Sequence, residues 1–364
     1  MRDEAGDALR AWLASTPEEA IDPEQPIIDA HHHLWDRRPR PPMKPGERVQ
    51  HRYLLDDLME DIRGGGHNVI DTVFVECQSM YREDRSDPHH VVGETEFVQG
   101  VAAMAASGLC AAEYGPGVRC CGAIVGAADL TLDPGLVDSV LCAHMAASQG
   151  FRGVRHGHGW HPSPGVHGSH APTRGRAQLL AADDYRAGLA VLMRLGLSLD
   201  CWGYFTQLDD VADMAAAFPD LNIVLNHLGG PITEGPYEGK RESVVFPQWY
   251  EAIKRGAECP NVVVKLGGCA MKMYGFGFDT REPGPARSEE LAAAWKPTLA
   301  HLIELFGPER CMFESNFPVD KVSCSYTGLW NAFKIVSNDL GLSQSEKDSV
   351  FFATAARAYA MPLS

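Results

Sequence analysis

Residues 26–33 read PIIDAHHH, an apolar run that ends in three consecutive histidines. The run Pro26–Ala30 has the continuously apolar character of a strand that is covered on both faces. Residues two apart on a strand point to the same side, so we expect His31 and His33 to converge and His32 to pack behind the strand. Two converging imidazoles can hold an ion or a substrate. We therefore predict a functional site at the end of this first strand.

Seven further strand-like runs follow along the chain, at residues 68–76, 121–127, 151–155, 197–202, 221–226, 261–266 and 310–314. Helical periodicity marks the intervening segments 53–62, 91–106, 136–147, 185–195, 208–218, 246–257, 289–306 and 329–336. This alternation predicts an α/β fold of the (β/α)8 TIM-barrel type. An open, doubly wound sheet is the alternative, but no G-x-G-x-x-G follows the first strand.

The domain organisation follows from this pattern. We predict one barrel domain over residues 27–364, preceded by an N-terminal extension over residues 1–26. Two long loops follow the fourth and seventh strands, at residues 157–182 and 267–287. Both lie at the carboxyl ends of strands, which is the face where barrel sites assemble.

Composition excludes several classes of partner. The 364 residues include 32 Lys and Arg against 48 Asp and Glu, a formal net charge of −16. Such a chain repels phosphate backbones and anionic lipids, so we expect neither nucleic acid nor membrane partners. No signal-like N-terminus is present and the ten cysteines contain no C-x-x-C, so we expect a cytoplasmic protein with reduced thiols. The exposed barrel surface permits a homodimer.

Several motifs resemble those of the amidohydrolase superfamily. They are residues 29–33 (DAHHH), 72–77 (TVFVEC), 151–156 (FRGVRH), 226–231 (NHLGGP), 263–268 (VVKLGG) and 312–320 (MFESNFPVD). Together they extend along nearly the whole chain. The resemblance is to the branch of TIM-barrel hydrolases related to sugar-lactone and dicarboxylate-lactone hydrolases, and it specifies the fold more closely than the substrate.

The resemblance implies a set of catalytic positions. In the superfamily an H-x-H pair, a His on strand five, a His on strand six and an Asp on strand eight surround the reacting carbonyl. His31 and His33 match the pair and His227 matches strand six, whereas Phe205 and Asn316 stand where relatives carry His and Asp. A neutral amide cannot act as general base, so the departure at Asn316 puts the usual proton transfer in doubt.

A divalent metal, Zn²⁺ foremost, is the predicted cofactor. We expect His31 and His33 to hold it together with Glu76, at the end of strand two, or Glu314, which points inward one layer below Asn316. The ion would polarise a carbonyl and activate water. Relatives occur with and without a metal, so a metal-free site stays open, with His33 or His227 as the base.

The predicted substrate is a small carboxylated molecule. Arg155 follows strand four, and a guanidinium there suits a carboxylate or a developing oxyanion. Lys265, at the end of strand seven, offers a second cation. Tyr81, Trp202 and Tyr204 are expected to line the same opening.

These residues predict an enzyme, a hydrolase that opens a lactone, or a related ester or amide, of a small carboxylated cyclic substrate. His31, His33, His227, Asn316 and Arg155 are the predicted catalytic residues. One alternative is a decarboxylase or lyase of the same superfamily that acts on an aromatic or unsaturated acid. Another is a catalytically altered barrel that only binds a ligand.

Overall fold

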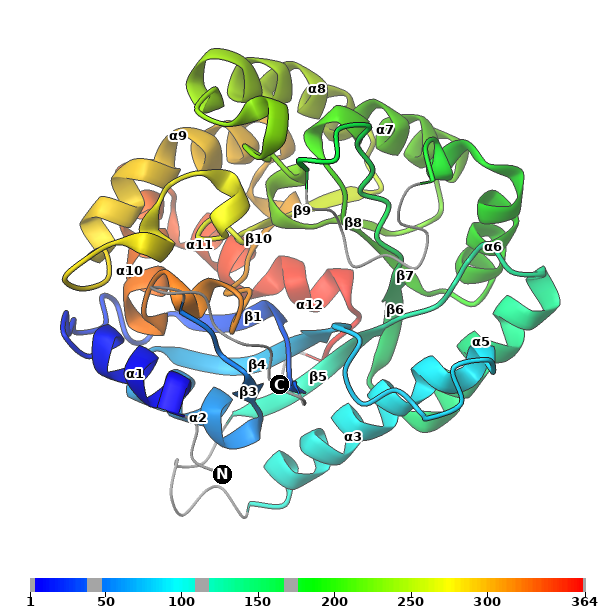
Figure 1. Ribbon diagram of the computed structural model, residues 1–364, viewed down its shortest axis with the longest axis horizontal. Coiled ribbons are helices and arrows are strands. Elements are labelled where there is room, and N and C mark those ends of the chain that lie inside the picture. Colours follow the sequence, from blue (N-terminus) through cyan, green and yellow to red (C-terminus); the bar gives the residue numbers. More distant parts are fainter. Residues whose placement is uncertain (1–3, 38–47, 109–117, 167–175, 363–364) are drawn as a thin grey trace.

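Eight parallel strands form one sheet that curls into a barrel (Figure 1). The computed structural model describes residues 4–37, 48–108, 118–166 and 176–362. Each strand pairs with the next along the chain. The strands are β1 (Pro26–His32), β4 (Asn68–Val75), β5 (Arg119–Gly126), β6 (Phe151–Arg155), β7 (Ser198–Cys201), β8 (Ile223–Leu225), β9 (Val262–Leu266) and β10 (Cys311–Phe313). The predicted TIM-barrel fold and its eight strands are confirmed.

The barrel is closed by the segment that follows β10. The backbone N–H of Asn316 donates to the carbonyl of His31 at 2.8 Å, and the N–H of His33 donates to the carbonyl of Phe317 at 2.8 Å. The buried Asp29 carboxylate accepts from the N–H of Ser315 at 2.8 Å. The first and last strands therefore meet at the histidine motif itself.

Helices surround the sheet and match the predicted helical segments. They are α2 (Leu55–Gly64), α3 (Val92–Ala106), α5 (Pro134–Ala147), α6 (Asp183–Arg194), α7 (Leu208–Ala217), α8 (Phe246–Glu258), α9 (Ser288–Phe306) and α10 (Tyr326–Asp339). The structure adds α1 (Glu4–Leu13), α11 (Gln344–Asp348), α12 (Thr354–Ala358) and a short ribbon of β2 (Trp35–Asp36) with β3 (Arg52–Tyr53). Among the described residues, no helix has both the length and the apolarity needed to cross a membrane.

The C-terminal helix α12 lies at one end of the barrel, and in the view of Figure 1 it is seen through the ring of strands. Ala355, Ala356 and Tyr359 pack against the inward-facing Val73 and Val125. A second, larger apolar layer lies between the sheet and the surrounding helices. Because α12 blocks one end of the barrel, the polar side chains gather at the other end, beyond the carboxyl ends of the strands.

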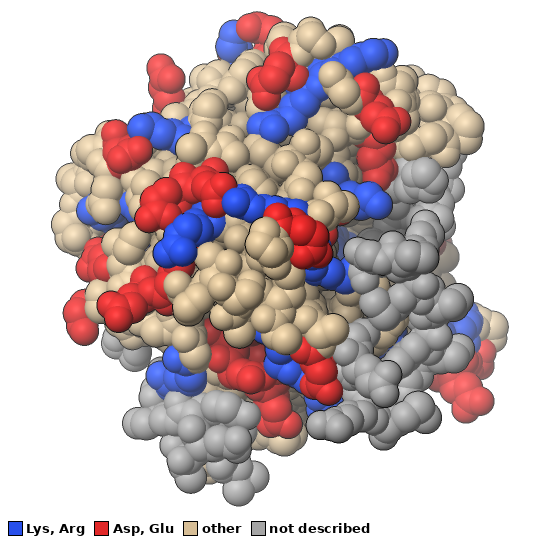
Figure 2. All heavy atoms as spheres, turned by 60° about the vertical axis from the view of Figure 1, so that its left-hand side comes forward, with Lys and Arg blue, Asp and Glu red and all other residues tan. Residues whose placement is uncertain are grey.

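The face drawn in Figure 2 carries acidic and basic side chains interspersed with one another. Surface ion pairs link neighbouring helices; the Lys296 ammonium of α9, for example, lies 2.9 Å from the Asp339 carboxylate of α10. Exposed pairs of this kind each contribute little to stability. The drawn face is mixed in charge despite the net negative charge of the chain.

The N-terminal extension packs on the outside of α9 and α10. The buried Asn331 amide accepts from the N–H of Ile21 at 2.7 Å and donates to the carbonyl of Glu19 at 2.8 Å. Lys334 donates to the carbonyl of Asp22 at 2.7 Å, and Glu18 accepts from the N–H of Ser288 at 3.0 Å. One amide side chain thus satisfies two backbone groups of the extension.

We predict that Asn331→Ala lowers the free energy of unfolding by about 1–3 kcal/mol, because it leaves these two backbone groups without their partners. Urea unfolding followed by circular dichroism measures the change. Asn338→Ala, an exposed asparagine on the same helix, is the matched control and should stay within about 0.5 kcal/mol of the original protein. Equal stability of both variants would show that the extension is not part of the cooperative unit.

Candidate active site

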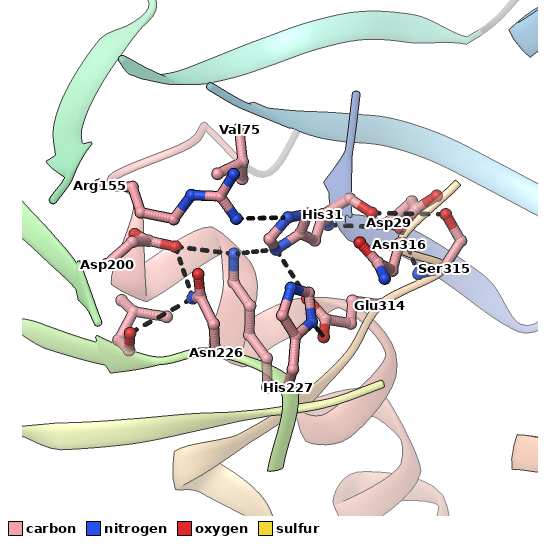
Figure 3. A network of polar contacts seen from close by, with 12 residues as sticks. Asp29, His31, Val75, Arg155, Asp200, Asn226, His227, Glu314, Ser315 and Asn316 are labelled. Carbon is pink, nitrogen blue, oxygen red and sulfur yellow. Dashed lines mark hydrogen bonds and ion pairs between the residues drawn. The ribbon is translucent and has the colours of Figure 1, made fainter. Parts of the chain in front are cut away.

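His31 lies at the centre of a buried polar cluster at the end of β1 (Figure 3). Its Nδ1 is 2.9 Å from Glu314 Oε2 and 3.2 Å from Lys265 Nζ. Its Nε2 is 3.2 Å from His33 Nε2 and 3.4 Å from the Arg155 guanidinium. The predicted convergence of His31 and His33 is thus present in the structure.

A β-bulge in β1 directs both histidines into the barrel. Ile28 and Ala30 already face the interior, so simple alternation would turn His32 inward. The pairing with β4 shifts between Asp29 and His32, where three steps along β1 oppose two steps along β4. The extra residue reverses the alternation, and His32 instead packs outside, 2.9 Å from the Thr72 hydroxyl.

Three side chains are placed to hold a metal ion. His31, His227 and Glu314 each offer a ligand atom, and these atoms lie within 4.8 Å of one another. His227 Nδ1 lies 2.6 Å from Glu314 Oε1. Glu314 comes from the end of β10, and His227 opens the 3-10 turn His227–Gly229 after β8. His31 and Glu314 were predicted as ligands, whereas the metal role of His227 was not. His33, also predicted as a ligand, is not part of this group.

The chemistry of these atoms fits a divalent cation. Glu314 Oε2 is buried without a hydrogen-bond donor, although it faces His31 Nδ1. Lys265 Nζ lies within donating distance of His31 Nδ1, so this nitrogen acts as an acceptor. The lone pair of Nδ1 and the carboxylate oxygen Oε2 therefore face each other without a proton between them. Ligand atoms around a tetrahedral Zn²⁺ lie about 3.4 Å apart, so small shifts of the triad suffice to accommodate the ion. Bound there, it would replace the proton that His227 shares with Glu314.

The histidines of the cluster are held neutral. Burial lowers the pKa of His31 well below its usual value, and the positive charges of Lys265 and Arg155 lower it further. Burial, followed by Arg155, has the same effect on the pKa of His33. The pKa of His227 is lowered by burial, in spite of the opposing effect of Glu314. Neutral imidazoles are the form that binds metals and accepts protons.

His33 has a defined hydrogen-bonding role. Its Nδ1 lies 2.7 Å from the carbonyl oxygen of Val75 and must donate to it, because a carbonyl only accepts. In the neutral ring Nε2 is then an acceptor directed into the cluster. The carbonyl of Val75, at the end of β4, thereby fixes the tautomer.

Arg155 and Glu76 pair with each other. The Arg155 Nε donates to Glu76 Oε1 at 2.7 Å, and its Nη2 donates to the backbone carbonyl of Glu76. Glu76 therefore lies outside the triad, and its predicted role as a metal ligand is not supported by this geometry. Only Nη1 of Arg155 has no partner within this pair, so Arg155 can offer a substrate carboxylate or oxyanion one free nitrogen rather than two.

The positive charge of Lys265 is also balanced by a buried carboxylate. Its ammonium donates to Asp200 at 2.9 Å, and both side chains are fully buried. Asp200 also accepts from Asn226 at 2.9 Å and from the Tyr359 hydroxyl at 2.9 Å. Lys265, predicted as a cation for the substrate, is therefore engaged with buried partners and does not line the cavity described below. Asp200 and Tyr359 were missed, although an acidic residue inside an apolar strand was a signal for a buried ion pair.

The two positions that depart from the superfamily pattern are not members of the triad. Asn316 has a positive φ of 54° and donates to Asp320 at 2.8 Å. Its Oδ1 is buried without a hydrogen-bond donor, and its catalytic role stays a prediction. Phe205 packs against the ring of Tyr237. Tyr204 is buried beside it and does not line the cavity described below.

A cavity of about 430 Å³ opens beside Arg155. Glu76, Arg155 and Trp202 form its inner end, and Tyr81 lines its wall as predicted. The Trp202 ring meets the His227 ring edge to face, with 4.8 Å between ring centres. Trp202 and Arg155 therefore separate the cavity from the triad by one layer of side chains.

The histidines of the loop after β6 make no second cluster of metal ligands among the described residues. His156 and His158 are buried, and burial lowers their pKa values to about 4 and about 3. His156 accepts from the N–H of Leu130 at 3.2 Å. His167 and His170 lie outside the described residues.

Comparison with known proteins establishes the family. Residues 118–361 match the family model described as Amidohydrolase, which covers more than half of the chain. The chain is 31% identical over 344 residues to the uncharacterized protein y4mH of Sinorhizobium fredii, covering 92% of this chain and 98% of that protein. It therefore belongs to the amidohydrolase family, as the motifs predicted.

More distant relatives have named activities. An L-fucono-1,5-lactonase of Burkholderia multivorans is 29% identical over 179 residues, which is 49% of this chain and 56% of that protein. An amidohydrolase of the same species, solved with bound zinc, superimposes with a TM-score of 0.65 at 24% identity, covering 92% of this chain and 99% of the other. This last likeness shows the fold alone.

We predict that Lys265→Met destabilises the protein by about 3–5 kcal/mol, because it leaves the Asp200 carboxylate buried without its cation. Adding Asp200→Asn should restore a large part of this loss, since the double variant buries no charge at the pair. Lys254→Met breaks an exposed ion pair with Glu251 and should cost at most about 1 kcal/mol. Denaturant unfolding of these three variants and of Asp200→Asn alone tests the interpretation, which additive losses in the double variant would contradict.

Proposed function

We propose that the protein is a hydrolase that opens a lactone, or a related ester or amide, of a small cyclic substrate. The observation that carries the proposal is the buried triad of His31, His227 and Glu314. In this triad Glu314 Oε2 faces His31 and has no hydrogen-bond donor. The lactonase among the distant relatives supports the reaction class. Zn²⁺ is the proposed ion, because two imidazoles and one carboxylate are a common donor set for catalytic zinc.

The triad would hold the ion, which when bound supplies polarisation of the substrate carbonyl and a lowered pKa for water. Arg155 Nη1 is the donor placed for the oxyanion that develops at the carbonyl oxygen. Glu76 holds the other two nitrogens of Arg155, so the guanidinium is fixed before substrate arrives. Such preorganised donors avoid reorganisation during the reaction.

His33 is the proposed base. Its Nε2 takes a proton from the attacking water, exchanging its contact with His31 for one with that water, while Val75 keeps Nδ1 protonated. When the ring C–O bond breaks, the same nitrogen returns the proton to the leaving oxygen, and the product is a hydroxy acid. Trp202 covers His227 and limits the entry of bulk water. A carboxylate on the substrate would meet Arg85, which is exposed at the outer end of the cavity.

We predict that His31→Ala and His33→Ala each lower kcat/KM for lactone hydrolysis by at least about 100-fold, a loss of about 2.7 kcal/mol in transition-state stabilisation. His301→Ala, a half-buried histidine of α9 that packs against Tyr250 of α8 outside the cluster, is the control and should leave the rate unchanged. Acid release from a panel of five- and six-membered lactones, followed in a pH-stat, is the measurement.

The same proteins are also assayed for CO₂ release from aromatic and unsaturated acids. Release of CO₂ without lactone hydrolysis would replace the proposal with a decarboxylase. Saturable binding of panel members without any turnover would identify a barrel that only binds its ligand.

A further inference from the structure

We infer that the site takes lactones that carry an apolar arm, such as an aryl or a branched alkyl group, and that the cavity beside Arg155 receives this arm. The inference rests on the proposed function for the identity of the reacting group. Such a substrate differs from the sugar-acid lactone that the name of the distant lactonase relative indicates.

The cavity begins one layer of side chains away from the triad, and residues of that layer contact both. Arg155 lines its inner end and reaches to 3.4 Å from His31, while Trp202 lines it and contacts His227. A lactone carbonyl placed at Arg155 Nη1 would therefore have its ring beside Trp202. Substituents on the ring then extend outward, toward the exposed Arg85.

The walls of the cavity are apolar between these two ends. Val137 and Val140 lie one turn apart on α5 and present side chains to the cavity, and Val91, Ala127 and Leu132 complete the wall. Val137 and Val140 are almost fully buried from solvent. The volume of about 430 Å³ lies within the range of small-molecule sites. An apolar arm would bring its own apolar surface out of water and into contact with this wall.

A polyhydroxylated ring does not suit the same wall. Each hydroxyl placed against the valines loses its hydrogen bonds to water and gains no partner, which costs free energy. Besides Glu76 and Arg155 at the inner end, the polar residues of the cavity include the exposed Gln78, Ser86 and Arg85, for which water competes, and the half-buried His90 and Asp129. Asp129 already accepts from the Thr131 hydroxyl at 2.6 Å. The wall therefore selects for an apolar substituent and against a sugar.

The test separates binding from turnover. Binding is measured by calorimetry with 3-phenylcyclopentanone and cyclopentanone, carbocyclic ketones that cannot be hydrolysed. Turnover is measured with γ-phenyl-γ-butyrolactone, γ-butyrolactone and D-glucono-1,5-lactone. We expect the phenyl ketone to bind at least 10-fold more tightly than cyclopentanone, equivalent to about 1.4 kcal/mol. We also expect kcat/KM to fall in the order phenyl lactone, unsubstituted lactone, gluconolactone.

Variants locate the effect. Val140→Phe fills the cavity and should abolish the advantage of the phenyl compounds while leaving cyclopentanone binding within about twofold. Leu132 is a half-buried lining residue in the loop before α5. Leu132→Phe serves as the second variant if Val140→Phe folds poorly. Met145→Phe places the same ring on the exposed face of α5 and is the control.

The outcomes distinguish the two proposals. If no lactone is hydrolysed but the phenyl ketone binds tightly and Val140→Phe removes that binding, the proposed reaction is wrong and the apolar site stands. If lactones are hydrolysed but both ketones bind equally, or gluconolactone is the best substrate, the apolar site is wrong and the reaction stands. An equal loss of both ketones in Val140→Phe and Leu132→Phe would also overturn the apolar site.

Discussion

The single extra residue in β1 is the constraint on which the site depends. From Asp29 to His32, β1 advances by three residues while the paired β4 advances by two. His31 and His33 therefore turn into the barrel, while His32 turns outward. The same stretch accepts and donates the hydrogen bonds that close the barrel against Asn316 and Phe317. Barrel closure and the orientation of the two histidines are consequently one structural event. A change that repaired the bulge would move His31 out of reach of Glu314.

Buried charges around His31 are balanced in pairs. Lys265 is paired with Asp200 and Arg155 with Glu76, and the four groups are buried. Such pairs do not by themselves stabilise a protein strongly, because desolvation offsets most of their attraction. Their effect here is on His31, whose pKa is depressed by burial and by both cations. The pairs thus keep the central imidazole neutral and available as a ligand.

Much of the fold could be predicted from the sequence, because all eight barrel strands are short apolar runs bounded by helical periodicity. That His31 and His33 point to the same side was predicted correctly. A regular alternation of inward and outward side chains starting from the inward Ile28 would instead have turned both histidines outward. A bulge leaves no pattern in a single sequence, so its position could not be read. The pairing of Glu76 with Arg155, and of Lys265 with Asp200, depends on contacts between strands far apart in the chain. The helix α12 was missed because five residues carry too little periodicity to identify it.

The central claim is that His31, His227 and Glu314 form a metal site. Crystals of protein purified without chelators, measured above and below the zinc absorption edge, test it directly. The account predicts an anomalous difference peak between His31 Nδ1, His227 and Glu314, with ligand distances of about 2.0–2.2 Å. A peak elsewhere, or clear density for the triad with no anomalous signal after zinc soaking, would contradict it. The mechanism would then have to rest on the histidines alone.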